Sequence, residues 1–262
     1  MKYLKRIVTT LLMLSIVFSS TISASASELS TDQQLEQRGI PSNLIKIMPE
    51  EQKEEIIAKN LVFDSYKKLT LDSPRRTIGG VSTLGGTLST DEMNFYCSVY
   101  KGYPWNSTDK TLTVYLNYDW LDEPNMTLTD CFGVGWDKNL WRLKPNSGMQ
   151  GTYYQIAPSF THDSRIESEF GHSLAYTSES GAGWNTDIKY AYGLEYVTHN
   201  YGYGSLVLEA KDPTKSGTDT LYINYSHAVG FGTVGLSFHG ASVTYNGSAD
   251  AYTVGNSYSF TY

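Results

Sequence analysis

The chain has 262 residues, with 20 Lys and Arg against 27 Asp and Glu, which gives a formal net charge of −7. This length suffices for one large domain with a small appendage. The negative charge disfavours nucleic-acid binding and attraction to anionic lipid headgroups, because a field of that sign repels phosphates. Aromatic residues make up 13% of the chain and 21 residues are Tyr, whose rings pack in a core while their hydroxyls reach water.

The first 26 residues have the pattern of a secretory signal peptide. Basic residues (Lys2, Lys5 and Arg6) precede an apolar run over residues 7–18, and Ala24-Ser25-Ala26 supplies small residues for cleavage. The apolar run is too short to span a bilayer as a helix, and no later stretch is long enough. We therefore expect cleavage after Ala26 and an exported, extracellular protein without a transmembrane segment. Cleavage removes three positive charges and no negative ones, so the net charge falls from −7 to −10.

Residues 27–69 predict a short helical segment. Gly39 is typical of a helix end, and Pro49 followed by acidic residues is typical of a helix start. Three helices are expected, over residues 32–38, over residues 41–48, and from Pro49 to about Phe63 or Tyr66. Their apolar residues are too few for an independent core, so the segment either docks on the rest of the chain or acts as a pro-segment.

Residues 70–92 are rich in Ser, Thr and Gly, which is typical of an extended linker. Within it, Arg75-Arg76 is interpreted as an exposed basic pair, although a trypsin-like protease would also recognise it. The linker separates the helical segment from the remainder of the chain.

Residues 93–262 predict a β domain. Apolar and polar residues alternate most clearly from Leu112 to Trp120, and the same pattern returns between Tyr201 and Tyr262. We expect about ten strands with no fixed internal period, which argues against a propeller or solenoid. Two packed antiparallel sheets, in a jelly-roll-like or immunoglobulin-like sandwich, are the natural arrangement of so many short strands.

The leader, the helical segment with Gly39-Ile40-Pro41 and Met48-Pro49-Glu50-Glu51, and the Tyr/Gly-rich sheet form a characteristic layout. This layout is similar to uncharacterised secreted proteins of Gram-positive bacteria. The resemblance covers the architecture and includes no catalytic motif, and it implies export.

Cys97 and Cys131 are the only cysteines. In an exported protein such a pair predicts one disulfide, worth about 3–4 kcal/mol in an unstrained loop of this length. A thiol zinc site would need further ligands at recognisable spacing, and a redox pair would be expected as Cys-x-x-Cys. We therefore predict a disulfide, no metal and no cofactor.

Aromatic residues supply the candidate binding surface. Trp136, Trp141 and Trp184 lie in Gly-, Asn- and Asp-rich surroundings, and Tyr201 and Tyr203 open the final sheet region. Sugar rings stack on such aromatic faces, so the main hypothesis is a secreted binding module for a cell-surface partner or an extracellular polysaccharide. The alternative that the tryptophans plug the ends of the sandwich stays open.

Two further hypotheses remain. A β-sandwich glycosidase would use two of Glu167, Glu195 and Glu209, with carboxyls roughly 5–10 Å apart in one groove. A secreted toxin or antimicrobial protein would use residues 27–92 as a pro-segment, and the small and apolar residues 230–236 suit a strand that rearranges into a pore. No catalytic constellation is evident in the sequence, which disfavours an enzyme.

Overall fold

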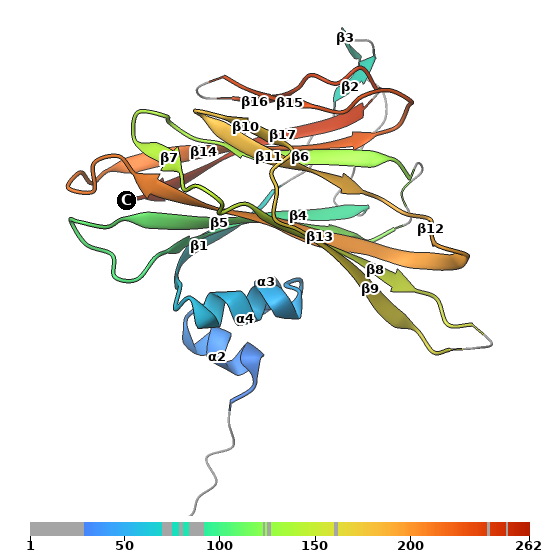
Figure 1. Ribbon diagram of the computed structural model, residues 1–262, viewed down its shortest axis with the longest axis horizontal. Coiled ribbons are helices and arrows are strands. Elements are labelled where there is room, and N and C mark those ends of the chain that lie inside the picture. Colours follow the sequence, from blue (N-terminus) through green and yellow to red (C-terminus); the bar gives the residue numbers. More distant parts are fainter. Residues whose placement is uncertain are drawn as a thin grey trace, which may run out of the picture.

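The computed structural model shows two antiparallel sheets packed as a sandwich, with three short helices beneath one of them (Figure 1). The mainly β class expected from the sequence is confirmed. The described residues are 29–69, 75–78, 81–83, 92–122, 124, 127–159, 162–239, 242–249 and 251–262. The expected signal peptide and most of the expected linker lie outside them. No helix in these ranges is long and apolar enough to cross a membrane.

The helices begin and end at sequence signals. They are α2 (Thr31–Gln37), α3 (Ser42–Ile45) and α4 (Glu50–Ala58). Ser30 caps α2, because its Oγ accepts a hydrogen bond from the Gln33 amide at 3.3 Å while the Gln33 side chain accepts one from the Ser30 amide at 3.0 Å. Gly39, at φ +83°, then turns the chain away.

Helix α4 ends earlier than expected. Asn60 adopts a left-handed conformation, with φ 48°, and the Leu61 amide donates to the Ile56 carbonyl at 3.1 Å. This closure ends the helix at Ala58 rather than at Phe63 or Tyr66. Residues 62–69 form a strand instead, so the predicted helical segment ends in the first strand of the sandwich.

The first sheet, called sheet A, has the strand order β1-β4-β5-β13-β8-β9, and the short strands β7 and β12 also pair with β13. Each neighbouring pair along this order is antiparallel. Its strands are β1 (Val62–Leu69), β4 (Met93–Lys101), β5 (Thr111–Trp120), β7 (Trp141–Leu143), β8 (Met149–Ile156), β9 (Arg165–Gly171), β12 (Ala191–Tyr192) and β13 (Glu195–Ala210).

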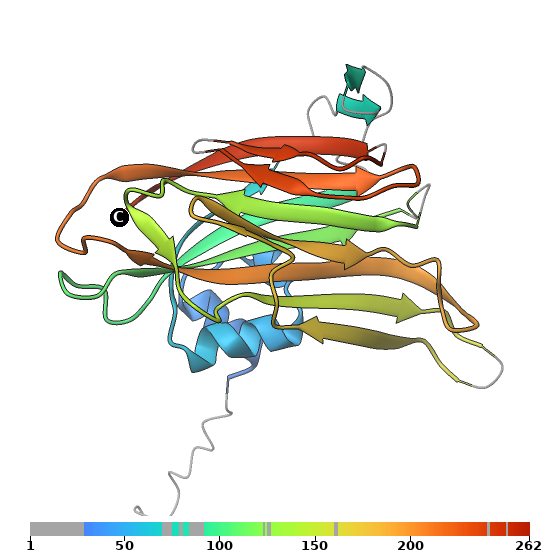
Figure 2. The ribbon, with the colours of Figure 1, turned by 45° about the horizontal axis from the view of Figure 1, so that its top comes forward.

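The second sheet, called sheet B, has the order β10-β11-β6-β14-β17-β2-β3. Its strands are β2 (Arg75–Ile78), β3 (Val81–Thr83), β6 (Thr129–Gly135), β10 (Tyr176–Ser178), β11 (Gly181–Asp187), β14 (Thr218–Ala228) and β17 (Ala251–Thr261). Arg75-Arg76, expected in a linker, therefore belongs to a strand that pairs with β17. A separate two-stranded sheet, β15 (Leu236–Phe238) with β16 (Val243–Tyr245), lies on the far side of sheet B from the helices (Figures 1 and 2).

The core between the sheets follows the alternation seen in the sequence. Leu112, Val114, Leu116, Tyr118 and Trp120 of β5 all point into it and are at most 3% exposed. At its centre the ring of Phe132 from sheet B contacts aromatic rings of both sheets. The centroid distances are 5.5 Å to Tyr118, 6.4 Å to Phe95, 5.2 Å to Trp184 and 6.1 Å to Tyr225.

The opposite face of sheet A is lined with tyrosines that the helices cover. The buried tyrosines of this face are Tyr96, Tyr100, Tyr115, Tyr153 and Tyr203. Leu35, Leu44 and Ile56, each 0% exposed, pack on them from the three helices. We call residues 31–58 the helical cover.

Polar contacts fix the position of the helical cover. Gln52 and Asn117, both buried, exchange amide hydrogen bonds of 3.3 and 2.6 Å, and the Tyr153 hydroxyl donates to Glu51 at 2.9 Å. Burial raises the pKa of Tyr153, and Tyr203 and Glu51 nearby raise it further. Because a buried amide without a partner is costly, the Gln52–Asn117 pair sets one position for α4 on the sheet.

The predicted disulfide is absent: Cys97 and Cys131 are both buried free thiols. Cys97 points into the core between the sheets, whereas Cys131 points out of sheet B toward Leu236 and Val243. The two-residue period of a strand explains this, because the neighbouring Phe132 takes the inward position. Burial raises the pKa of both thiols.

Both thiols are therefore expected to resist modification in the folded protein. A thiol reagent such as DTNB should label neither cysteine under native conditions without reductant, and both once the chain is unfolded in guanidinium. Counting labelled thiols by mass spectrometry checks this. Two unreactive cysteines in the unfolded, unreduced chain would show that a disulfide exists.

The Gln52–Asn117 pair gives a second prediction. Asn117→Leu leaves the Gln52 amide buried without a partner, so it should lower the free energy of unfolding by about 1–3 kcal/mol. The double variant Gln52→Leu/Asn117→Leu should recover part of that loss, because no amide is left unpaired. Urea unfolding of the wild type, both single variants and the double variant measures the coupling, and strictly additive losses would contradict it.

Candidate functional site

The three tryptophans expected to bind a ligand are buried. Trp136 and Trp141 are 0% exposed and Trp184 is 1% exposed. Trp184 stacks on Phe132, with ring centroids 5.2 Å apart and planes at 25°, and the Trp141 indole donates to Asp219 at 3.0 Å. None of these rings faces a polymer in solution, in accord with the alternative in which the tryptophans fill the sandwich.

Tyr201 and Tyr203 lie on the other side of sheet A from the tryptophans. Tyr203 is 0% exposed beneath the helical cover, and the half-buried Tyr201 stacks on Tyr153 with centroids 5.0 Å apart. Burial raises the pKa of both hydroxyls. The five expected residues therefore do not form one surface.

The glutamates of the glycosidase hypothesis are arranged as ion pairs. Arg165 binds Glu167 through Nε at 2.7 Å and also pairs with Glu195, which lowers the pKa of Glu195 to about 2, with a further contribution from His162. A glycosidase acid needs a raised pKa. Glu209 lies near the other end of the 16-residue strand β13, roughly 45 Å from Glu195 at about 3.3 Å per residue. This geometry does not support a glycosidase.

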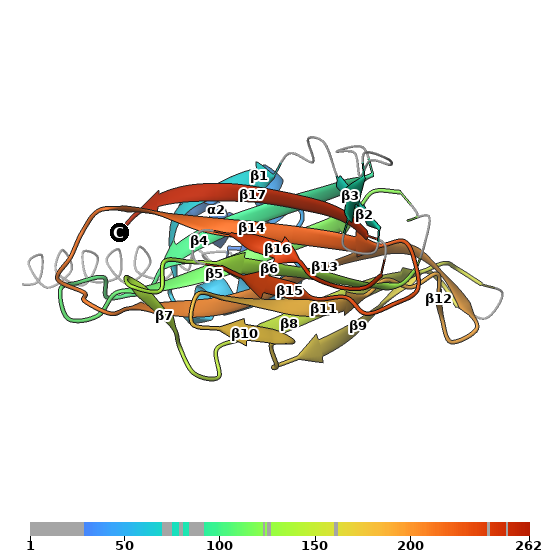
Figure 3. The same cartoon turned by 90° about the horizontal axis from the view of Figure 1, so that it is seen from above.

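A different feature stands out on sheet B. Between β14 and β17, residues 229–239 and 242–249 leave the sheet and fold back over its outer face as the β15–β16 hairpin (Figure 3). Leu236 pairs with Tyr245 and Phe238 with Val243. We call residues 229–250 the hairpin segment.

A glycine stripe on sheet B makes room for it. Gly133 and Gly135 of β6 lie directly opposite Gly183 and Gly181 of β11. A Cβ at Gly133 or Gly183 would stand 2.9 Å from Leu236 Cδ1, and one at Gly135 would stand 2.9 Å from Val243 Cγ2. Only glycines allow the apolar side chains of the hairpin to approach the sheet so closely.

Side chains of sheet B and its turns donate hydrogen bonds to the backbone of the hairpin segment. The Tyr176 hydroxyl donates to the Val234 carbonyl at 3.1 Å, and the Asn224 amide donates to the Val243 carbonyl at 3.4 Å. Longer bonds run from Ser180 Oγ to the Phe238 carbonyl at 3.5 Å and from the Cys131 thiol to the Gly235 carbonyl at 3.9 Å. Its backbone ladder is its own, because β15 and β16 pair with each other in a separate sheet. Lifting the hairpin from the sandwich therefore breaks none of the ladders of sheets A and B.

The two faces of the hairpin segment differ in polarity. Leu236 and Val243 are buried and Phe238 is half-buried against sheet B. The opposite face carries small polar residues, including the exposed Thr244 and the Asn246 amide that donates to Ser237 at 2.6 Å. One face of both arms is apolar or small, at residues 230, 232, 234, 236 and 238 and at 243, 245, 247 and 249. The other face is polar at residues 233, 237, 239, 242, 244, 246 and 248, and Val229, Phe231 and Gly235 interrupt it.

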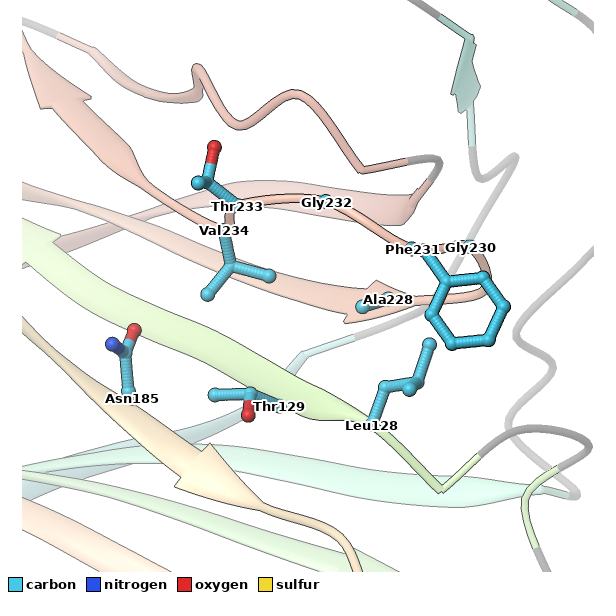
Figure 4. A pocket seen from close by; sticks show the side chains of 9 residues that line it. All are labelled: Leu128, Thr129, Asn185, Ala228, Gly230, Phe231, Gly232, Thr233 and Val234. Atoms are coloured by element: carbon cyan, nitrogen blue, oxygen red, sulfur yellow. The ribbon is translucent and has the colours of Figure 1, made fainter.

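A pocket of about 390 Å³ lies where the hairpin segment leaves β14 (Figure 4). Leu128 and Phe231 lie together at one side of it, and Val234 points into it from the returning chain. Gly232 has φ +149° and a Cβ there would stand 2.6 Å from the Ala249 amide nitrogen, so this turn requires glycine. The turn holds Phe231 out in solvent, 91% exposed.

Other apolar side chains are exposed at the same end of the sandwich. Leu121 (48% exposed) follows β5, and Leu194 (104%) occupies the turn between β12 and β13, close to Tyr190 (56%). Leu121 lies at the end where β14 stops, because the ring of the preceding Trp120 contacts that of His227 in β14, with centroids 4.7 Å apart. The β12–β13 turn lies toward the same end, because Tyr201 of β13 pairs with Asp119 and the residues before Tyr201 continue past β5. Exposed apolar groups gathered on loop tips indicate a contact surface.

Comparison with known proteins gives distant likenesses only. No family model matches the chain, and no curated protein matches it. Similar solved structures include one described as a pore forming protein, with 10% identity and a TM-score of 0.37, covering 75% of this chain and 96% of that one. The delta-toxin of Clostridium perfringens is 9% identical, with a TM-score of 0.32, and covers 77% of this chain and 93% of its own. The NetB toxin of the same organism, in its membrane-inserted form, is 9% identical, with a TM-score of 0.25 and coverages of 75% and 95%.

The main hypothesis from the sequence, a binding module for a cell surface or an extracellular polymer, is wrong. Trp136, Trp141, Trp184 and Tyr203, on which the hypothesis depended, are enclosed in the protein. The residues that stand out instead are the hairpin segment and its glycine stripe, of which the sequence analysis singled out only residues 230–236.

A side chain added at a glycine of the stripe should weaken the packing of the hairpin segment on sheet B. Gly135→Ala should push on Val243 and loosen the hairpin, with a loss of about 1–3 kcal/mol in the free energy of unfolding. Limited proteolysis should then cut within residues 229–250 faster than in the wild type. Gly171→Ala is the matched control, because nothing lies within 4 Å of a Cβ at Gly171. Equal proteolysis of the two variants would contradict the role of the stripe.

Proposed function

We propose that this chain is a secreted pore-forming toxin, and that the hairpin segment leaves sheet B and enters a lipid bilayer. The observation that carries the proposal is a separate amphipathic hairpin, seated by apolar side chains on a glycine stripe and outside both sheet ladders. The rest of the molecule would remain outside the bilayer as a folded sandwich.

The pattern and length of the segment support this role. A strand of a membrane barrel needs about 9–11 residues, with apolar side chains toward lipid and polar ones toward the lumen. Each arm of residues 229–250 has about that length, and its faces divide in that way. Leu236, Phe238 and Val243 would face lipid, and Ser237 and Thr244 would face water.

The cost of release is moderate. Removing Leu236, Phe238 and Val243 from sheet B forfeits about 5–8 kcal/mol of apolar burial. Insertion into hydrocarbon buries the same side chains again, so the bilayer replaces the glycine stripe as their apolar environment. Joining of several hairpins into a closed barrel satisfies their backbone groups.

The exposed loop tips support the choice of a membrane as target. Leu121, Leu194 and Phe231 lie at the end of the sandwich from which the hairpin segment departs. The negative net charge favours a neutral, zwitterionic membrane over an anionic one. Export of the chain, with cleavage after Ala26, is part of this proposal.

The contacts of β1 and the helical cover argue against removal of the N-terminal residues as a pro-segment. Strand β1 pairs along β4, and the helical cover buries the tyrosines of sheet A. Loss of residues 27–69 would expose that apolar face and open the edge of β4. We therefore treat residues 29–69 as part of the active fold.

A disulfide lock tests the function. In a Cys131→Ala background, Gly135→Cys and Val243→Cys introduce two cysteines on facing positions of sheet B and the hairpin. They lie close enough for a disulfide, because a Cβ at position 135 would stand 2.9 Å from Val243 Cγ2. Oxidation should tie the hairpin to sheet B and abolish dye release from phosphatidylcholine–cholesterol liposomes, and reductant should restore it.

The control for the lock is the same background with Val243→Cys alone, which cannot form the bond and should release dye whether or not reductant is present. Dye release by the oxidised, locked protein would contradict insertion of the hairpin segment. Absence of release by the wild type at any concentration would contradict pore formation itself.

A further inference from the structure

Sheet A ends in two strands that run in opposite directions. Six strands lie along the order β1-β4-β5-β13-β8-β9, and each is antiparallel to the next. Among the described strands, β1 pairs only with β4 and β9 only with β8. When two copies stand side by side in the same orientation, β9 of one therefore meets β1 of the other as an antiparallel neighbour.

The two edges carry opposite charges. On β9, Glu167 pairs with Arg165 at 2.7 Å and Glu169 pairs with Lys189 at 2.5 Å, yet the two carboxylate side chains stay 34% and 46% exposed. They lie opposite Tyr154 and Thr152 on the core side of the sheet. On β1, Lys67 and Lys68 are both exposed, and Lys67 lies opposite Cys97, also on the core side. The Lys67 ammonium donates to Asn256 Oδ1 at 3.1 Å and to the Ser257 carbonyl at 2.9 Å but has no carboxylate partner among the described residues of this chain, so a carboxylate of a second copy would replace neutral acceptors. An antiparallel junction would therefore place carboxylates and an ammonium group on one face.

The side of sheet A that bears the helical cover also differs at the two edges. Beside β9 lies a pocket of about 530 Å³, with apolar walls from Met149, Phe170 and Ala58. Three carboxylates, those of Glu51, Glu54 and Glu55, line it against the single ammonium of Lys59. At the other edge Lys68 stands on the helix side, above the ring of Tyr96 at 5.8 Å.

Exposed apolar residues accompany the charges. Ile166 and Phe170 of β9 are 59% and 49% exposed on the helix side, and Val62 of β1 is 48% exposed. Soluble proteins commonly protect a sheet edge with charged side chains, proline, a bulge or a covering element, and β1 carries a bulge between Phe63 and Ser65. The β9 edge combines exposed apolar groups with a pocket, and the β1 edge carries the complementary charge. This combination suits contact with a second copy of the same chain.

We propose that copies of this chain assemble head to tail, with the β9 edge of one copy joined to the β1 edge of the next. Lys67 faces Glu167 and Glu169 across the junction, and Lys68 reaches the acidic pocket beside Phe170. The contact is heterologous and closes into a ring when the rotation between copies permits. It rests on the proposed function in that a pore needs several hairpin segments, one from each copy.

Carbodiimide coupling of the wild type tests the contact without any substitution. The reagent joins a lysine amine to a carboxylate in contact with it, as an amide, with loss of water. A mixture of unlabelled and ¹⁵N-labelled protein is coupled on phosphatidylcholine–cholesterol liposomes and in detergent micelles, and mixed-isotope peptides are identified by mass spectrometry. We expect links from Lys67 or Lys68 to Glu167, Glu169 or the glutamates of the pocket.

Charge reversal provides the second arm. The variant Lys67→Glu/Lys68→Glu makes both edges acidic, and the variant Glu167→Lys/Glu169→Lys makes both edges basic. Each variant alone should assemble roughly tenfold less than the wild type, because like charges then meet at the junction. An equimolar mixture should recover assembly, because acidic and basic edges alternate. Lys138→Glu/Lys215→Glu, on side chains 53% and 63% exposed elsewhere, is the matched control and should leave assembly unchanged.

Assembly is measured by sedimentation in detergent, and pore formation is measured separately by dye release. Oligomers whose cross-links map elsewhere, failure of the wild type to assemble, or a mixture no better than either variant would overturn the edge contact. Dye release with cross-links at other residues leaves the proposed function standing without this junction. Cross-links at the expected residues without dye release support the junction and contradict the pore.

Discussion

The constraint on which this fold depends is the two-sided nature of its strands. Packing of Phe132 against Phe95, Tyr118 and Tyr225 joins the inner faces of the two sheets. Each strand that contributes to this contact also sends every second side chain outward. In sheet A those outward side chains include a cluster of buried tyrosines, and in part of sheet B they are glycines, so each outer face needs a cover of its own. The result is four layers, from the helical cover through both sheets to the hairpin segment (Figure 2).

The two covers are attached in different ways. The helical cover is positioned by directional hydrogen bonds, above all the buried Gln52–Asn117 pair, and it continues directly into β1. The hairpin segment rests on apolar contacts with a glycine-lined surface and on hydrogen bonds from side chains of sheet B to its backbone. Its two strands pair with each other and not with sheet B, so it separates as a unit, which suits it to moving while the rest of the molecule stays folded.

Much of the fold follows from periodicity, and the site does not. The alternation from Leu112 to Trp120 predicts a half-buried strand, and Gly39 and Pro49 mark helix ends, because these signals are local. The early end of α4 depends on Asn60 adopting a left-handed turn, which residue type alone does not dictate. Cys131 was paired with Cys97 in sequence, yet one residue of register places its thiol on the opposite face of sheet B. The Gly- and Asn-rich neighbours of Trp136, Trp141 and Trp184 favour an accessible binding surface, whereas burial depends on contacts distant in the chain. The spacing of two between Gly133 and Gly135, and between Gly181 and Gly183, was the available signal for the hairpin, but only strand pairing shows that the four glycines adjoin.

The amide pair beneath α4 has a consequence for the response of the molecule to dissolved salt. Gln52 and Asn117 carry no charge and are buried, so ions in solution do not weaken their hydrogen bonds. The helical cover therefore keeps its position at both low and high ionic strength. Lysines and glutamates on the outer strands are exposed, and at physiological ionic strength their fields fade within about 8 Å. The position of the helical cover therefore does not depend on ionic strength, whereas the electrostatic attraction between two molecules decreases as ionic strength rises.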